Sequence, residues 1–371
     1  MLYLVMLHAK EKGTDRPLIL AGRNAHKTFL SAVALLDLDV EWLYPEYDWG
    51  YLACFLTPHG LTAELERLKA QGRLPAAVYL TSPDYLGHTL DIERLSAVCH
   101  AFGVLLVVDN AHGAYLRFLP ESGHPMDLGA DLCCDSAHKT LPVLTGGAYL
   151  HIGAHLPMSL KVQAKQALAL FGSTSPSYLI LQSLDMANAV MADAAFTASL
   201  AETARRVEAC CERLRACGLS AHCHEPLKLT INTNLYGYTG VEVAEYLRQS
   251  GTECEFADPN FVVLMFTPAI TEADVEKLTE VLTALPKRDP LLLCPPPLMP
   301  PKRVMSIREA LFSPAEVLPV EECIGRIAAA ATVGCPPAVP IVVSGEVINE
   351  GAVACFQYYG IETCMVVKEG F

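Results

Sequence analysis

The chain has 371 residues, of which 52% are hydrophobic, and its 27 basic and 41 acidic residues leave a formal net charge of −14. This length fits two or three domains around a substantial core, and the composition excludes a disordered, collagenous or low-complexity protein. So acidic a body is a poor partner for nucleic-acid phosphates or anionic lipid, and we expect neither a nucleic-acid partner nor a membrane association.

Short apolar runs alternate with helical patterns over the first 150 residues. The runs at 18–21, 76–81, 104–108, 131–134 and 148–151 predict strands, and residues 91–102 have helical spacing. Continuous apolar strands separated by helices indicate a mainly parallel sheet that is covered on both faces. We therefore predict an α/β large domain over residues 1–178.

The pattern changes in the second half of the chain. Residues 179–217 predict one long helix, closed by Gly218. Together with shorter predicted elements, it forms a smaller α+β domain over 179–289. Five prolines within 295–301 indicate a stiff linker at 290–303, followed by a C-terminal unit at 304–371. The shorter elements are strands at 227–232 and 261–266 and helices at 241–249 and 272–285.

The 14 cysteines indicate a reducing compartment. Cys133 and Cys134 are adjacent, as are Cys210 and Cys211, and the sequence contains no Cys-x-x-Cys. Scattered thiols in a large chain differ from the disulfide framework of a small secreted domain. The apolar residues 1–7 lack the basic region and the cleavage site of a secretory signal. We therefore predict a cytoplasmic protein with reduced thiols.

Ionisable residues follow the predicted strands of the large domain, where ligands bind in open α/β sheets. Asp109 ends an apolar strand, where a carboxylate is costly to bury without a cation, and Lys139 follows the next strand. A lysine of lowered pKa can form a Schiff base, and pyridoxal phosphate uses such a lysine together with an acid that faces its ring nitrogen. An ordinary ion pair between Asp109 and Lys139, or two unconnected loop residues, are the alternatives.

Several segments resemble the ornithine/lysine/arginine decarboxylase family. They are RNAHKT at 23–28, DNAHGAY at 109–115, DSAHKT at 135–140, STSPSYLILQSLD at 173–185 and GRIAAAATVGCPPAVPIVVSGEVI at 325–348. The resemblance runs nearly end to end. It implies a fold type I pyridoxal-phosphate enzyme with an aspartate-aminotransferase-like large domain, at least a homodimer. The implied reaction converts lysine, ornithine or arginine to an amine and CO2, and the sequence does not decide which amino acid is used.

By matching position, the resemblance implies roles for individual residues. A surface turn for His26, a structural role for His112 and a solvated surface position for Glu346 are the alternatives. For the cofactor, the resemblance implies that Lys139 forms the Schiff base, Asp109 pairs with the pyridine nitrogen, His26 and Ala111 stack on the two ring faces, Ser136 and His138 contact the phosphate, and His112 lies near the ring oxygen. It also implies that Thr174 or Ser175 reaches the phosphate of the partner subunit and that Glu346 lies near the substrate entrance. Lys139 or His138 is the implied proton donor to the substrate Cα.

Two departures from the family lead to further expectations. The family has a phosphate-binding Gly/Ser/Thr loop upstream of the helix that matches residues 1–10, so we expect this chain to bind pyridoxal phosphate weakly. Asp84 stands where the family usually has threonine, and near the cofactor its charge would be repulsive unless it faces away. A catalytically impaired homologue, an aminotransferase and a carbon–sulfur lyase are therefore alternative functions.

The sequence shows one further group of metal-ligand residues, at His222, Cys223 and His224. Only two imidazoles share a face of such an extended segment, whereas zinc takes about four ligands. No second cluster is apparent along the chain, and we expect no metal site.

Overall fold

The large domain contains a six-stranded sheet of order β2-β1-β3-β4-β5-β6. The computed structural model describes residues 1–45, 50–297, 300–331 and 338–370. Neighbouring strands are parallel from β2 to β5, and β6 pairs antiparallel with β5. The sheet is therefore mainly parallel, with one antiparallel edge strand. The strands are β1 (Leu18–Gly22), β2 (Asp39–Leu43), β3 (Ala77–Thr81), β4 (Leu105–Asp109), β5 (Leu132–Asp135) and β6 (Tyr149–Ile152).

Five of these strands match the predicted apolar runs to within a residue or two, and β2 was not predicted. Strand β2 has the sequence DVEWL, in which Asp39 and Glu41 alternate with apolar residues. Its partly exposed pattern is that of an edge strand, so it lacks the continuous apolar run used to find the others.

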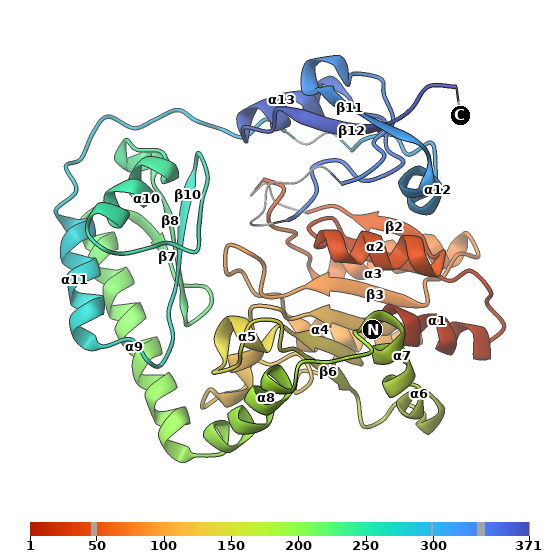
Figure 1. Cartoon of the computed structure of the whole chain (residues 1–371), viewed down its shortest axis with the longest axis horizontal. Coiled ribbons are helices and arrows are strands. Elements are labelled where there is room, and N and C mark those ends of the chain that lie inside the picture. The colour runs from red at the N-terminus through yellow and green to blue at the C-terminus, as the bar shows by residue number, and fades with distance from the viewer. Residues whose placement is uncertain (46–49, 298–299, 332–337, 371) are drawn as a thin grey trace.

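Helices cover both faces of this sheet (Figure 1). On one face, α1 and α2 pack with the short α6 and α7 against side chains of β1 and β3, and on the other α3 and α4 pack against β3 and β4. These two apolar layers hold the sheet and leave its carboxyl edge to the connecting loops. The helices are α1 (Leu2–Glu11), α2 (Lys27–Leu36), α3 (Pro58–Ala70), α4 (Ile92–Ala101), α6 (Met158–Val162) and α7 (Ala164–Phe171).

The predicted single helix over 179–217 is wrong, because the structure has two helices there. Helix α8 covers Tyr178–Met191 and α9 covers Ala194–Ala216. Asp193 lies between them in an extended conformation, and its carboxylate accepts the Ala195 N–H at 2.9 Å. A short acidic side chain competes with helical hydrogen bonding in this way, so Asp193 begins a new helix.

A second sheet of four antiparallel strands, in the order β7-β8-β10-β9, follows α9. Figure 1 shows it beside the carboxyl edge of the large sheet, with α9 as the connection. The elements are β7 (Ser220–His222), β8 (Lys228–Asn232), the 3₁₀ turn η2 (Asn234–Tyr236), α10 (Gly240–Gln249), β9 (Phe256–Ala257), β10 (Phe261–Met265) and α11 (Glu272–Thr283).

The C-terminal unit lies over the β2 side of the large sheet, with α12 beside α2 (Figure 1). Arg23, which follows β1, donates to the carbonyls of Pro340 and Ile341 and lies 3.2 Å from the Glu346 carboxylate, so a buried ion pair fastens this unit to the large domain. The Pro336–Pro337 pair lies outside the described residues. The elements are α12 (Ile307–Phe312), β11 (Ala315–Pro319), the 3₁₀ turn η3 (Val320–Glu322), α13 (Glu350–Tyr358) and β12 (Thr363–Val367).

The described strands thus fall into three chain regions, with only an isolated bridge at Arg303 between residues 290 and 303. We propose the domain division at residues 178, 289 and 303 on this basis. In the part of the chain that the structure covers, no helix combines the length and the apolar character needed to cross a bilayer.

Candidate active site

A cavity of about 390 Å³ lies at the carboxyl edge of the large sheet. Loops that follow β1, β3, β4 and β5 supply most of its wall, and the small domain and the C-terminal unit close it. Most of the candidate cofactor residues therefore meet at one place. Those that line the cavity are His26, Asp109, Ala111, His112, Ser136 and Lys139, together with Thr81, Tyr85 and Glu255.

Lys139 lies in α5 (Ala137–Thr140), a single turn that begins directly after β5. Its Nζ is 3.1 Å from the Nε2 of His112. Burial lowers the pKa of the Lys139 ammonium, and the nearby Asp109 and Glu255 carboxylates oppose this effect in part. A larger fraction of uncharged amine is available at neutral pH than for an exposed lysine, which suits attack on an aldehyde.

His112 follows β4 and is buried against the ring of Tyr85, whose centroid lies 5.0 Å away in an edge-on arrangement. Burial, followed by the charges of Lys228 and Lys139, lowers the pKa of His112 well below its ordinary value. The imidazole is therefore neutral near pH 7. A neutral Nε2 can accept a hydrogen bond from the Lys139 amine and so fix its direction.

Asp109 is the last residue of β4, and its carboxylate is held by groups around it. The hydroxyl of Tyr79, on neighbouring β3, donates to Asp109 Oδ2 at 2.9 Å, and the Ala111 N–H donates to Oδ1 at 3.2 Å. Burial raises the pKa of the Tyr79 phenol well above its usual range, which keeps it a donor. The carboxylate thus has a fixed orientation on the cavity floor.

His26 begins α2 as its N-cap residue and lines the same cavity. Its Nδ1 accepts the Thr28 N–H at 3.2 Å, so the ring position is set by the helix start. Burial lowers the pKa of His26, with the Asp109 carboxylate acting in the opposite direction. A neutral aromatic ring therefore lines the same cavity as the residues that follow β4 and β5.

Four predicted site residues do not line this cavity. The Nδ1 of His138 is 2.9 Å from the Gly147 carbonyl oxygen. Thr174 and Ser175 are exposed between α7 and α8, at a distance along the chain from the cavity loops. The Glu346 carboxylate is 2% exposed, paired with Arg23 and bonded to the Val343 N–H at 2.7 Å, and the structure does not place it at the substrate entrance.

Asp84 faces away from the cavity, which removes the expected repulsion. Its Oδ1 accepts the N–H groups of Leu86 and His88, each at 2.9 Å, and its Oδ2 lies 2.9 Å from the His88 Nδ1. Asp84 thus shapes the loop after β3 that carries Tyr85.

Thr81, Tyr85 and Glu255 of the cavity wall, and Tyr79 beside it, were not found from the sequence. Tyr79 orients Asp109, and Tyr85 donates its hydroxyl to Glu255 Oε1 at 2.9 Å. Glu255 reaches the cavity from the small domain, just before β9. A phenol within the mostly aliphatic run AAVYLT was a signal for Tyr79, whereas nothing in its own segment indicates Glu255.

Comparisons with known proteins identify the family. A model of the Orn/Lys/Arg decarboxylase major domain matches residues 4–220, and a model of the C-terminal domain of that family matches residues 294–365. The chain belongs to the Orn/Lys/Arg decarboxylase family. The predicted resemblance, the fold type I architecture and the enzyme class, an amino-acid decarboxylase, are thereby confirmed.

Individual relatives agree with this assignment. The chain is 32% identical over 355 residues to the arginine decarboxylase of Bacillus subtilis (strain 168), covering 90% of this chain and 71% of that protein. The Francisella novicida lysine decarboxylase LdcF superposes with a TM-score of 0.78 at 16% identity, covering 95% of this chain and 66% of that one. The constitutive lysine decarboxylase of E. coli gives 0.76 at 17% identity, with coverage of 95% and 67%.

The residues that line the cavity fit the pyridoxal phosphate of this family. In the described part of the chain, Thr81 Oγ1 and His112 Nδ1 are buried and have no hydrogen-bond partner, although both residues line the cavity. Buried polar atoms without partners are costly and indicate a ligand or an ion that pairs with them. An amine of lowered pKa, a fixed carboxylate and two neutral imidazoles are also the groups that hold an aromatic aldehyde with a basic ring nitrogen.

Proposed function

We propose that this chain decarboxylates a basic amino acid with bound pyridoxal phosphate, and that L-arginine is its preferred substrate. The observation that carries the proposal is the Glu255 carboxylate, which lies in the same cavity as Lys139 and Asp109 and is held by Tyr85. A carboxylate there is the acceptor that the cationic end of a basic amino acid requires. Arginine is favoured because the relatives at 29–32% identity include enzymes named arginine decarboxylase.

The residues of the chain divide the work of this reaction. Bound pyridoxal phosphate supplies the electron sink for the pair released when the bond between Cα and the carboxylate breaks. Lys139 would hold the cofactor aldehyde until the substrate amine replaces it, and Asp109 would keep a proton on the pyridine nitrogen. His26 and Ala111 would confine the ring. Once displaced by the substrate, the Lys139 side chain in its ammonium form, directed by His112, would be placed to return a proton to Cα.

Glu255 can be tested apart from the chemistry that Lys139 performs. We expect Glu255→Gln to raise the KM for arginine by about tenfold or more, because the charge-assisted hydrogen bond to the guanidinium is lost. Glu253→Gln is the matched control, since Glu253 lies in the same segment and pairs with Arg248 at the surface. Initial rates of CO2 release from arginine, lysine and ornithine give the comparison.

The products of the same assay distinguish the proposed reaction from its alternatives. Agmatine and CO2 in equal amounts support decarboxylation of arginine. A keto acid with consumption of an acceptor indicates an aminotransferase, and turnover of a sulfur amino acid indicates a carbon–sulfur lyase. No turnover of any basic amino acid at saturating pyridoxal phosphate contradicts the proposal and indicates a catalytically impaired homologue.

We also propose a cytoplasmic homodimer, in which the segment at 173–177 reaches the site of the partner subunit. Large apolar side chains are exposed along α6, α7 and α8, more than a lone surface usually presents. A second apolar cavity, of about 610 Å³, runs from Phe171 to Tyr79 and Asp109, so this face is continuous with the cofactor site. The exposed side chains include Met158, Leu168, Phe171, Tyr178, Leu179 and Met186.

Sedimentation of the wild type and of Leu179→Glu tests this dimer. A charge on the exposed face of α8 is expected to shift the protein towards monomer, whereas Leu292→Glu, in the linker, leaves the mass unchanged. A wild type that sediments as a folded monomer at micromolar concentration contradicts the dimer but leaves the proposed reaction open to its own assay.

A further inference from the structure

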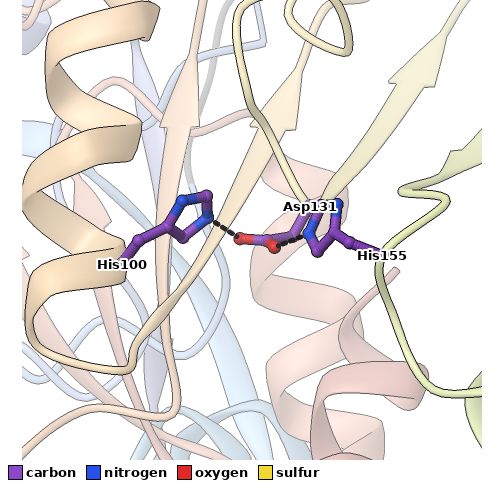
Figure 2. A group of neighbouring side chains, drawn as sticks. All are labelled: His100, Asp131 and His155. Carbon is purple, nitrogen blue, oxygen red and sulfur yellow. Dashed lines mark hydrogen bonds and ion pairs between the residues drawn. The ribbon is translucent and has the colours of Figure 1, made fainter.

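A carboxylate flanked by two imidazoles lies at the amino end of β5, on the opposite side of the large sheet from the cavity. His100 Nε2 is 3.1 Å from Asp131 Oδ2, and His155 Nε2 is 2.6 Å from Asp131 Oδ1. Figure 2 shows the two rings pointing at the carboxylate from either side, His100 from the end of α4 and His155 from the loop after β6. Their ligand atoms all lie within 4.8 Å of one another.

The central carboxylate is fixed in place by the backbone around it. The Leu106 N–H donates to Asp131 Oδ2 at 2.6 Å, the Asp131 N–H donates to the Leu106 carbonyl, and the Asp131 carbonyl accepts the Gly153 N–H. Asp131 is therefore tied to both neighbouring elements, β4 and the loop after β6. A carboxylate whose other contacts are hydrogen bonds of this kind is oriented as metal-binding carboxylates are.

The two imidazoles remain accessible. The side chains of His100 and His155 are 43% and 55% exposed, whereas that of Asp131 is 2% exposed. Gly153 leaves room for one of them, because a Cβ atom at this position would lie 2.6 Å from the His155 Cε1. The cluster thus has a buried, fixed oxygen and two nitrogens that an ion can approach from solvent.

The geometry points to a binding site for a divalent transition-metal ion, with Zn²⁺ as the first candidate, formed by His100, Asp131 and His155. Two imidazole nitrogens and one carboxylate oxygen suit zinc, nickel or copper, whereas calcium and magnesium need a shell of oxygens. Three protein ligands at the surface leave a fourth position for water. Only small shifts are needed to bring the three atoms to bonding distances of about 2.0–2.2 Å from one ion.

A second group of metal-ligand residues, His124, Cys133 and Asp135, is less suited to bind an ion. All three are buried, and the Asp135 carboxylate already accepts from Asn110 at 2.7 Å and from His151 at 2.7 Å. Burial raises the pKa of the Cys133 thiol well above its usual range, so the thiolate that metals bind is disfavoured. The site at His100, Asp131 and His155 differs from this group because solvent reaches its imidazoles and because none of its ligands is a protonated thiol.

The proposed ion would act on the fold and not on the reaction. Its ligands join the end of α4, the start of β5 and the loop after β6, and none of them lines the cavity that contains Lys139. An ion that binds the folded chain in preference to the unfolded one raises the midpoint of unfolding by mass action. This inference does not depend on the proposed substrate.

The test is a calorimetric titration of the chelator-treated 371-residue chain with Zn²⁺, in the wild type and in a His100→Ala/His155→Ala double variant. We expect the wild type to bind one equivalent more than the double variant and to gain a higher unfolding temperature with Zn²⁺. His59→Ala is the matched control, because His59 is an exposed histidine on another helix, α3. Its stoichiometry is expected to equal that of the wild type.

Cobalt distinguishes this site from binding to the 14 cysteines. Co²⁺ in a site of two imidazoles and a carboxylate gives visible ligand-field bands without the charge-transfer band of a thiolate ligand. We expect those bands in the wild type and in His59→Ala and their loss in the double variant. Equal metal stoichiometry in the wild type and the double variant, or an equal loss in His59→Ala, would overturn the assignment.

Discussion

Strand β5 carries an aspartate at each end, and each carboxylate lies between two imidazoles. Asp131 contacts the half-exposed His100 and His155, whereas Asp135 contacts the buried His124, the partly exposed His151 and the amide of Asn110. At the carboxyl end, the group is part of the scaffold that carries Lys139, since Asn110 and Asp135 adjoin Asp109 and Ser136 in sequence. At the amino end, the same residue types face solvent. Similar side chains therefore form a buried hydrogen-bonded group at one edge of the sheet and the proposed ion site, open to solvent, at the other.

Lys139→Ala should have the largest effect on decarboxylation. It should suppress the reaction at the carboxyl edge of the sheet without changing Zn²⁺ binding at the amino edge. Removing the amine is expected to abolish the visible band of lysine-bound pyridoxal phosphate and to lower decarboxylation by a factor on the order of 10³ or more, because Lys139 is the only lysine among the described residues that line the cavity. The extra Zn²⁺ equivalent should remain. Absorbance titration and calorimetry measure the two effects.

Lys27→Ala is the control for this experiment, since Lys27 is an exposed lysine at the start of α2. The variant should keep the band. If Lys139→Ala kept the band and Lys27→Ala lost it, Lys27 and not Lys139 would be the residue that binds the cofactor aldehyde. That result would contradict the proposed site.

Asp135→Asn should destabilise the fold more than Asp131→Asn. The substitution removes the negative charge and replaces one of the two acceptor oxygens by an NH2 group, so the buried His124 and Asn110 share a single neutral acceptor, which costs about 3–5 kcal/mol. At Asp131 the freed imidazoles can be hydrated, so we expect about 1–3 kcal/mol. Urea unfolding of both variants measures the difference. Equal losses in the free energy of unfolding would show that burial of the histidine partners does not distinguish the two groups.

Acid unfolding should report on Asp135. Although burial opposes ionisation, hydrogen bonds from His124 and His151 hold the pKa of this carboxyl well below its ordinary value. A lowered pKa in the folded state means that the stabilisation is fully present above the unfolded pKa of about 3.9 and is lost as the pH falls below it. We expect the free energy of unfolding of Asp135→Asn to fall less steeply than that of the wild type between about pH 5 and pH 3. Parallel slopes would mean that other groups cause the acid transition.

Gly153→Ala should have the smallest effect on stability and a specific effect on the surface site. The added Cβ would displace the His155 ring, which can move into solvent, and would lie 3.2 Å from the Asp131 carbonyl oxygen. We expect a loss of about 1 kcal/mol in urea unfolding together with weaker Zn²⁺ binding and unchanged decarboxylation. Unaltered Zn²⁺ affinity would show that the position of His155 does not matter to the ion.

Much of the active site could be predicted because it follows from one rule. His26, His112 and Lys139 each come shortly after a strand of the parallel sheet and Asp109 is the last residue of one, and parallel strands place their carboxyl ends at the same edge. Family motifs then separated these residues from ordinary loop residues. Apolar runs also found five of the six strands of the large sheet; β1, β3, β4 and β5 are largely buried on both faces, whereas the edge strand β6 is partly exposed.

Other parts of the site depend on contacts that no local pattern records. Tyr79 bonds to Asp109 across two neighbouring strands, and Glu255 reaches the cavity from a different sheet. Asp193 lies within the predicted long helix, but its carboxylate accepts the Ala195 N–H and begins a second helix. In each case the partner, not the residue type, decides the role.

The sequence by itself determined the family, the parallel core and several of the residues that line the cavity, because these depend on short motifs and on the apolar periodicity of single elements. The tertiary structure alone decided which ionisable groups become partners. His100 lies 31 residues before Asp131 in the chain, and His155 lies 24 residues after it, so their spacing gives no sign of a common site. They meet because α4 ends, β5 begins and the loop after β6 starts at the same edge of the sheet, and only packing brings such distant residues into contact.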